Sequence, residues 1–559
     1  MKNDGAQDAK KQRKKMSPLR FLLNMIFSFL LALIAIYVVL TMISLVQRQK
    51  TYEHIPPGYS AYLCVPSASS LAQQVIHLDA ASSLLVGSDY MEIAGLLRSL
   101  RVQGTLDSFF VRRLGDVRLD AAVYADGGFV AAVDMGLRSG LLPAVKLFAT
   151  QILPGMEIGS QIRFHDDGFP HYQVQAGDSV LYLAIHRNLV LLASSRQLLQ
   201  AAVAGDFRSV VVRPPKKDSM LRVLIPSDVI SVTENSGSRG AESGFLQQLV
   251  SALVIEDSLI VDLLPDNEHV YLHATAALSS SDELLHTLLT RSSETPAVLS
   301  RLPESVEYFS LLHIAQVESL WDTFEPYLGS AADAKRTADR AARMALGGSI
   351  DDLIFSWIGD EVGVFGTSFG PSPVFFVRIA DEQRRRQVFE TIFASLLAGQ
   401  DVSAVVNGRR IPRIVFPSFI TGFLQALEIQ LSEPFYLESD GILYASNSAE
   451  VLAAAVEQIN NNDLMVRTRR WDRLMNNISG QSSAMMYYDV NRSLPFFLRS
   501  NAAIGQALGL YDVGALSLRI DDEILSLDFS AMRSGTREVA DLPGFPLQAE
   551  SRFDSSPYS

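Results

Sequence analysis

The sequence predicts an α+β protein: an N-terminal transmembrane helix followed by two tandem homologous α+β lobes, mainly antiparallel sheets with helices on one face. Three observations support this fold class: a long uncharged apolar run, segments that recur in the same order, and hairpin patterns within each recurrence. The 559 residues allow one large domain or two to four ordinary ones. A net charge of −13 argues against a general nucleic-acid binder, and the single cysteine excludes an intramolecular disulfide.

The apolar run covers residues 21–46 and contains no charged residue. As a helix it would be about 39 Å long at ~1.5 Å per residue, which exceeds the ~30 Å of a hydrocarbon core. The run is longer than the ~7–15 apolar residues of a cleaved secretory signal, and no small-residue cleavage pattern follows it. We therefore expect a transmembrane helix that acts as a signal anchor.

Basic residues around this run predict its orientation. Seven precede it, whereas only Arg48 and Lys50 follow it closely. The positive-inside rule then assigns residues 1–20 to a basic cytoplasmic tail. The first 50 residues hold nine of the 48 basic and two of the 61 acidic residues, so the rest carries a net charge of −20. We expect a single-pass protein of a bacterial inner (cytoplasmic) membrane with an acidic periplasmic, or otherwise extracytoplasmic, ectodomain.

Segments of the expected ectodomain recur once, in the same order. In the clearest pair, 188–204 and 440–456, a short apolar strand, an Ala-Ser step and an Ala/Leu-rich helix follow one another. The step places Ser and Asn side chains where they can cap the helix. The other pairs are 56–76 with 303–324, 115–135 with 359–379, 221–230 with 484–498, and 259–276 with 516–531. We predict two copies of one unit, residues 56–277 and 303–532; unrelated strand–helix runs are the alternative.

Hairpins followed by helices favour antiparallel sheet in each copy. Residues 259–276 and 516–531 alternate around acidic turns, as hairpins do. The Ala-rich, charged stretch 329–349 predicts either an exposed helix held by charge pairs or a partly disordered segment. The tail 533–559 has no periodic apolar pattern and predicts disorder.

Ser368 lies in Gly366-Thr-Ser-Phe-Gly370, which matches the GxSxG pattern of serine hydrolases. In those enzymes the serine sits on a sharp turn between a strand and a helix. Here an apolar strand follows, so the turn joins two strands, and no histidine follows His313. Ser368 is kept as a remote catalytic candidate, and catalysis is not the expected function.

His165, Asp167 and His171 could hold a divalent metal ion through two imidazoles and a carboxylate. The same stretch contains Asp-Asp-Gly, which a tight turn favours because Asp bonds its own backbone and Gly accepts a positive φ. We prefer the turn, and expect no metal and no cofactor.

Residues 416–431 carry an aromatic and aliphatic stripe with the spacing of one helix face. Core packing is one interpretation of this stripe. The other is a face for a lipid or another apolar ligand. The ligand-binding candidates are Phe416, Phe419, Ile420, Phe423, Leu424 and Leu427.

The segment 436–450 and its partner around 193–195 resemble modules of uncharacterised bacterial single-pass membrane-anchored proteins with a domain of unknown function. The resemblance covers most of the expected ectodomain and implies an N-terminal anchor and duplicated strand–helix modules. It transfers no catalytic residue. We therefore expect a non-enzymatic, membrane-tethered binding or envelope-organising protein, with residues 21–46 in the membrane and an envelope protein or a lipid as partner. Binding of an apolar ligand by 416–431 is the alternative.

Overall fold

The chain, seen in a computed structural model, divides into two compact units that we describe separately. Unit 1 comprises Met1–Ala68 and Leu114–Pro214, and unit 2 comprises Ser69–Arg113 and Pro215–Ser559. The structure describes residues 18–46, 48–71, 116–142, 162–166, 168–176, 179–205, 207, 219–229, 256–265, 269–278, 295–313, 330–396, 403–426, 431, 433–489, 511–521 and 523–533. Most of the predicted basic tail and of the predicted disordered tail lies outside them.

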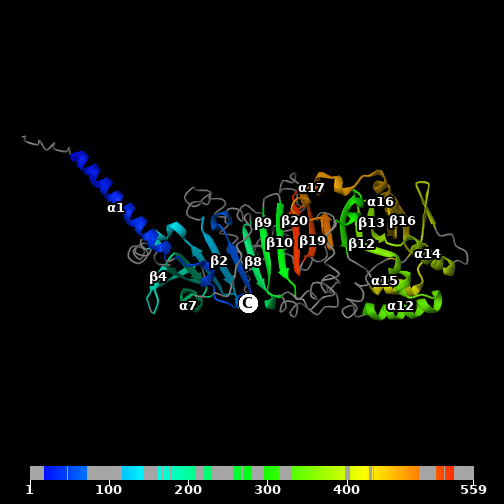
Figure 1. Cartoon of the computed structure of the whole chain (residues 1–559), viewed down its shortest axis with the longest axis horizontal. Helices are drawn as coiled ribbons and strands as arrows, with labels where there is room; N and C mark the ends of the chain where they lie inside the picture. The colour runs from blue at the N-terminus through cyan, green and yellow to red at the C-terminus, as the bar shows by residue number, and fades with distance from the viewer. Residues whose placement is uncertain are drawn as a thin grey trace, which may run out of the picture. The chain divides into compact units, whose positions relative to one another are not determined.

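Unit 1 contains a seven-stranded antiparallel sheet with the strand order β1-β2-β3-β7-β6-β5-β4 (Figure 1). The strands are β1 (Ala61–Val65), β2 (Arg118–Val123), β3 (Phe129–Asp134), β4 (Ile162–His165), β5 (His171–Ala176), β6 (Ser179–His186) and β7 (Leu189–Ala193). Its described helices are α1 (Pro18–Val46), η1 (Thr51–His54), η3 (Gly136–Leu141) and α7 (Arg196–Ala204).

Unit 2 contains eleven antiparallel strands in the order β8-β9-β10-β20-β19-β18-β11-β12-β13-β17-β16. They are β8 (Leu221–Pro226), β9 (Ser258–Pro265), β10 (His269–Ala277), β11 (Val306–His313), β12 (Ile358–Thr367), β13 (Gly370–Ile379), β16 (Phe435–Ser439), β17 (Ile442–Ser446), β18 (Ala484–Asp489), β19 (Val513–Asp521) and β20 (Ile524–Met532). A separate hairpin pairs β14 (Ser403–Val406) with β15 (Arg409–Pro412).

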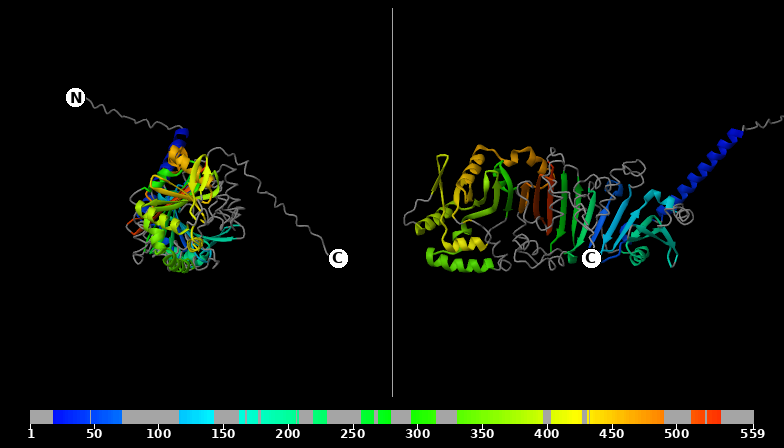
Figure 2. Two further views of the ribbon diagram at one scale, coloured as in Figure 1. Left: turned by 90° about the vertical axis from the view of Figure 1, so that its right-hand side faces the viewer. Right: turned by 180° about the vertical axis from the view of Figure 1, so that it is seen from behind.

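The helices that the structure describes in unit 2 lie on both faces of the sheet. They are η6 (Ala297–Arg301), α12 (Ser330–Leu346), α13 (Ile350–Leu353), η8 (Phe355–Trp357), α14 (Glu382–Leu396), α15 (Ser418–Ala426), α16 (Ala449–Asn461), η9 (Met465–Arg467) and α17 (Arg469–Met475). In β17, Ile442 and Tyr444 enter the core that α16 covers, whereas Leu443 enters a second core with α12 and α15. α12 and α15 lie side by side in that second core (Figure 2). Because successive strand residues face opposite sides, these two cores lie on opposite faces.

The predicted fold class of two α+β lobes with helices on one face is therefore wrong. Strands dominate: eighteen belong to antiparallel sheet in the two units together. The units also do not coincide with the predicted lobes. The physical reason is the pairing of β10 with β20, nine residue pairs from His269↔Met532 to Ala277↔Ile524, which joins the end of one predicted lobe to the end of the other.

The predicted transmembrane helix is also wrong, and so are the membrane, single-pass, signal-anchor, periplasmic and inner-membrane assignments that depended on it. Among the residues described, no helix has both the length and the apolarity that crossing a membrane requires. A helix, α1, does form over the apolar run, but its C-terminal turns pack against η3. Thr41 is buried there, and a Cβ on Gly140 would collide with the Thr41 side chain. A contact of this kind between distant residues cannot be predicted from the hydropathy of the apolar run.

Several local predictions are confirmed. Ser195 caps α7 by accepting from the Leu198 N–H, and Ser448 caps α16 by accepting from the Val451 N–H. The hairpins predicted over 259–276 and 516–531 are β9–β10 and β19–β20. Gene duplication stays a prediction. It is supported by corresponding strand orders: β1-β2-β3-β7-β6 beside β11-β12-β13-β17-β16, and β8-β9-β10 beside β18-β19-β20.

We predict that Asp262→Asn destabilises unit 2 by about 3 kcal/mol, because it removes the carboxylate from a buried charge pair. Arg222 Nε and Nη2 donate to the two Asp262 oxygens at 2.7 and 2.6 Å, and the side chains are 9% and 3% exposed. The measurement is chemical denaturation of the full chain. The control is Asp440→Asn, which breaks an exposed pair with Arg301 and should cost less than about 1 kcal/mol. Equal losses for the two variants would contradict the prediction.

Candidate functional site

Ser368 occupies a hairpin turn. Thr367 pairs with Gly370, so Ser368 and Phe369 connect β12 directly to β13. Ser368 is exposed, and its N–H donates to the Ser305 carbonyl at 3.1 Å. This strand–turn–strand geometry differs from the strand–turn–helix of a nucleophile elbow.

His165 and His171 are brought together by the β4–β5 hairpin, where they are direct register partners. Their rings stack with centroids 5.3 Å apart. His171 Nδ1 lies 3.1 Å from the Phe169 carbonyl oxygen. Asp167, the third candidate ligand, lies outside the described residues.

The apolar stripe 416–431 lies mainly on α15 and packs into the protein. Ile420 and Phe423 are each 1% exposed, in the core shared with α12. Phe416, Phe419 and Leu424 are partly buried against the same core, and Leu427 lies outside the described residues. The described part of the stripe therefore has the contacts of core residues.

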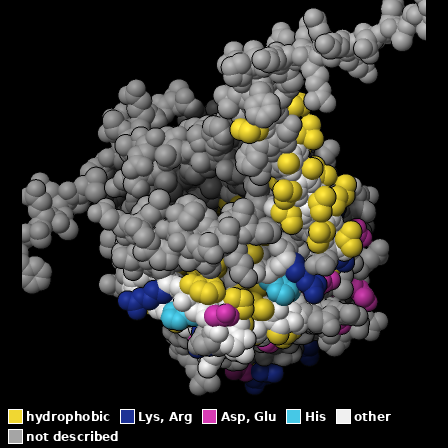
Figure 3. Space-filling view, turned by 90° about the vertical axis from the view of Figure 1, so that its left-hand side faces the viewer, with side chains coloured by type: hydrophobic (Ala, Val, Ile, Leu, Met, Phe, Trp, Pro, Cys, Tyr) yellow, Lys and Arg dark blue, Asp and Glu magenta, His cyan; other side chains and the backbone are white. Residues whose placement is uncertain are grey.

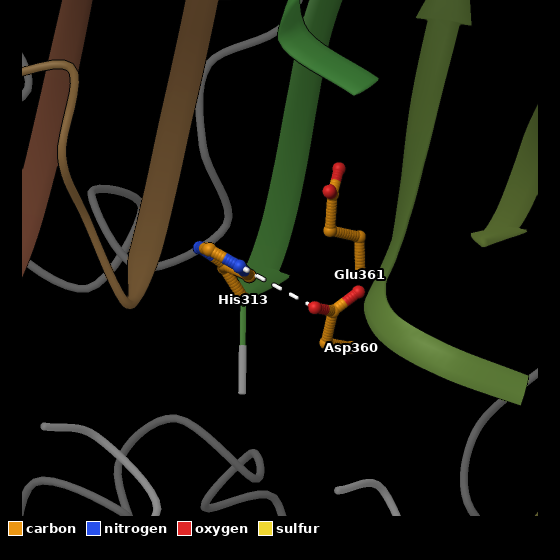
Figure 4. A group of neighbouring side chains, drawn as sticks. All are labelled: His313, Asp360 and Glu361. Atoms are coloured by element: carbon orange, nitrogen blue, oxygen red, sulfur yellow. Dashed lines mark ion pairs between the residues drawn. The ribbon is translucent and has the colours of Figure 1, made fainter. Parts of the chain in front are cut away.

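Three potential metal ligands of unit 2 lie close together in a different cluster: His313, Asp360 and Glu361 (Figure 4). His313 ends β11, and its register partner across the sheet is Glu361 on β12. The register of β12 against β13 shifts between Ile358 and Val362, which is the mark of a bulge. Neighbouring strand residues normally face opposite sides, and a bulge can redirect one of them. One donor atom from each of the three side chains lies within 4.8 Å of the other two.

The two carboxylates of the cluster have different partners. Glu361 is 1% exposed and accepts from the Ala297 and Val298 N–H groups at 3.0 and 2.7 Å, at the start of η6. Arg378 on β13 donates through Nη1 to both Asp360 and Glu361, at 3.1 Å each. The guanidinium therefore bridges the two carboxylates.

His313 is 4% exposed, and its Nδ1 has no hydrogen-bond partner among the described residues. Its Nε2 faces Asp360 Oδ2 at 3.9 Å, which is too long for a hydrogen bond. This cluster was not among the site residues predicted from the sequence. The available signal was an Asp-Glu pair inside an otherwise apolar strand, since two adjacent acids on one strand cannot both face solvent without an irregularity.

A second feature lies in unit 1, where residues 48–54 connect α1 to the sheet; we name these residues the junction. Arg48 Nη2 donates to Asp134 Oδ2 at 2.6 Å. Asn188 accepts from the Gln49 N–H at 2.8 Å, and its Nδ2 donates to the Gln49 carbonyl at 3.1 Å and to Asp134 Oδ1 at 2.9 Å. Together these bonds attach the chain just after α1 to Asp134 at the end of β3 and to Asn188 in the β6–β7 turn.

The junction is buried further along the chain. Thr51 donates to Asp120, which is fully buried. His54 lies between the Ala202 carbonyl and the Gln49 side chain, and burial lowers the pKa of its imidazole. Burial would raise the pKa of Asp134, but hydrogen bonds from Arg48 and Asn188 outweigh it and hold that pKa below its ordinary value.

α1, which precedes the junction, carries most of the large apolar side chains that are exposed to solvent among the described residues (Figure 3). Twelve lie on α1 and six elsewhere. Exposed apolar surface concentrated on one element is typical of an interaction site. The twelve are Met25, Phe27, Leu30, Leu31, Ile34, Ile36, Tyr37, Val38, Val39, Met42, Ile43 and Val46.

Comparisons with known proteins give little guidance. No family model matches the chain, and no curated protein matches it. Among solved structures, crystal forms I, III and IV of TP0453 match with TM-scores of 0.25, 0.23 and 0.24, at 8–9% identity. The matches cover 41–42% of this chain and 81–82% of the TP0453 chains. TM-scores this low carry no argument about fold or function.

We predict that Asp134→Asn loosens the junction, because Arg48 then loses the carboxylate that it binds. The lowered pKa of Asp134 gives the pH dependence. The stabilisation is fully present above the unfolded-state pKa of about 3.9 and is lost as the pH falls through the lower folded-state pKa. Hydrogen exchange at residues 48–54 should therefore accelerate several-fold at neutral pH in the variant, and in the wild type only in acid.

The matched control for this substitution is Asp126→Asn. Asp126 accepts from the Gly128 N–H within the β2–β3 turn, whereas the junction bonds to Asp134, Asn188 and Asp120. It should leave exchange at 48–54 unchanged. Unchanged exchange in Asp134→Asn as well would show that the carboxylate does not hold α1.

Proposed function

We propose that the protein is a non-enzymatic binding protein that associates, through α1, with α1 of a second copy. The observation that supports this proposal is the spacing of the exposed apolar side chains on α1. A helix that is apolar on its outer faces gains stability only when another apolar surface covers it. The α1 helix of a second copy is one such surface, because it is apolar on the same faces and has the same length.

Six exposed apolar side chains on α1 form a stripe that follows a seven-residue repeat. Met25, Ala32, Val39 and Val46 are spaced by seven, and Ile36 and Ile43 lie between them, four residues after one member and three before the next. All six are exposed. Apolar residues alternating at intervals of three and four are the pattern of two helices that pack along a common seam. Val39 and the two isoleucines are β-branched, which suits such a seam.

This stripe lies opposite the side of α1 that already contacts protein. Val39 is two residues from both Tyr37 and Thr41, so at ~100° per residue it lies about 160° from each. Thr41 and the Tyr37 carbonyl are the groups that approach Gly140 of η3. One side of α1 is thus packed against unit 1, and the seven-residue stripe faces away from it, where a second helix can lie without displacing η3.

The junction gives the association a consequence for the rest of unit 1. Since Arg48, Gln49 and Thr51 attach the chain after α1 to β3, the β6–β7 turn and β2, pairing of two α1 helices would hold two copies of unit 1 at a defined separation. A binding protein of this kind presents two identical surfaces side by side, which raises the effective concentration of each for a shared partner.

Cysteine scanning of the full chain tests the proposal. The sole native cysteine, Cys64, is buried, so engineered cysteines are the accessible ones. Ile36→Cys, Val39→Cys and Ile43→Cys should form an intermolecular disulfide under mild oxidation in a non-ionic detergent, giving a species of twice the 61.4 kDa chain. The expected yield is at least several-fold above that of the controls Leu31→Cys and Val38→Cys.

Both controls are as exposed as the test positions, at 56% for Leu31 and 47% for Val38, but lie on another face of the helix. Equal crosslinking at all five positions would indicate nonspecific clustering and overturn the proposal. So would the absence of crosslinks, or conjugates only of another mass, because the partner would then not be a second copy.

A further inference from the structure

We propose that His313, Asp360 and Glu361 form a binding site for one divalent transition-metal ion, and that Arg378 competes with the ion for the two carboxylates. One imidazole and two carboxylates form a ligand set that suits Zn²⁺, Mn²⁺ or Fe²⁺. The proposal concerns unit 2 alone and does not depend on the association of α1.

The distances fit an ion better than they fit direct contact. Two ligand atoms on one ion, each at ~2.1 Å, are at most about 4.2 Å apart. His313 Nε2 and Asp360 Oδ2, at 3.9 Å, are too far apart for a hydrogen bond but within this limit. The three donors lie within 4.8 Å of one another, so a side-chain shift of well under 1 Å brings all of them into range.

The buried imidazole points to a ligand independently of the acids. Buried polar groups are normally hydrogen-bonded. His313 is 4% exposed, with Nδ1 lacking a partner among the described residues and Nε2 facing the Asp360 carboxylate without reaching it. Figure 4 shows its ring directed toward Asp360. An ion bound between Nε2 and the Asp360 carboxylate would replace this long contact by direct coordination of both groups.

Glu361 can take part without losing its structural contacts. Its oxygens accept from the Ala297 and Val298 N–H groups, one each. A carboxylate oxygen has two lone pairs, so one can hold the N–H while the other binds the ion. Glu361 thus links the site to η6, and its buried position places a negative charge where a cation is needed.

Arg378 is the cation that the two carboxylates hold in this structure. Its Nη1 lies 3.1 Å from both Asp360 and Glu361, and its side chain is 45% exposed. Because its side chain is half exposed, the guanidinium can turn toward solvent when a divalent ion takes its place between the two carboxylates. Removal of Arg378 should therefore strengthen metal binding, whereas removal of a metal ligand should weaken it.

The test is Zn²⁺ binding to the full chain, measured by competition with a chromogenic chelator, together with the visible absorption of bound Co²⁺. Wild type should bind one ion per chain. Asp360→Asn should weaken binding at least tenfold, and Arg378→Gln should tighten it at least threefold. Thermal unfolding of each variant without metal checks that it folds.

The matched control is His165→Gln, which removes an imidazole next to His171 in the other unit and should leave the affinity and the Co²⁺ spectrum unchanged. If Asp360, Glu361 and Arg378 form only a structural ion pair, Arg378→Gln lowers stability without raising affinity. That result would overturn the proposal. So would the absence of stoichiometric binding in wild type, or loss of the Co²⁺ spectrum in His165→Gln.

Discussion

Nine consecutive residue pairs between β10 and β20 hold unit 2 together. The strands come from segments about 255 residues apart in the chain, and they are neighbours in Figure 1. A row of polar side chains crosses the pairing: Arg222 on β8, Asp262 on β9, His273 on β10, Asp528 on β20 and Ser517 on β19 are successive register partners. His273 Nδ1 lies 2.6 Å from Asp528 Oδ1, and the Tyr271 hydroxyl donates to the same oxygen at 2.8 Å.

This row fixes the register. A slip of β10 against β20 by one residue would turn the side chains of one strand to the other face and separate His273 from Asp528. β20 is joined through β19 and β18 to β11, where His313 is the register partner of Glu361 on β12. The candidate metal ligands thus belong to the same run of paired strands.

Features that depend on neighbouring residues could be predicted from the sequence. The caps at Ser195 and Ser448 and the hairpins β9–β10 and β19–β20 follow from local spacing and turn chemistry. For 329–349 the sequence left a helix and a disordered segment as alternatives, and α12 forms there. Lateral pairing of distant strands leaves no such local signal, so β10 and β20 were assigned to separate lobes. The apolar stripe of α15 likewise has the same period whether it faces a ligand or, as Ile420 and Phe423 do, a core.

The candidate site escaped prediction for a related reason. Asp360 and Glu361 are adjacent in the chain, so a regular strand would direct them to opposite faces, and only the bulge against β13 allows both to reach His313. The apolar run was predicted as a transmembrane helix, which is wrong; the helix α1 that forms there contacts η3 near Gly140, about a hundred residues further along the chain. In both cases the local sequence pattern predicts the helix or strand, whereas the contacts of that helix or strand depend on tertiary packing.

Cross-strand disulfide formation between β10 and β20 is the most direct test of this account. Ala277 and Ile524 are register partners at an exposed end of the pairing, and the native Cys64 is buried. The double variant Ala277→Cys/Ile524→Cys should form an intramolecular disulfide nearly completely under mild oxidation, whereas Ala277→Cys/Ser526→Cys, shifted by two residues, should form little. Equal yields in the two variants, or no disulfide in the first, would contradict the pairing on which the arrangement of unit 2 depends.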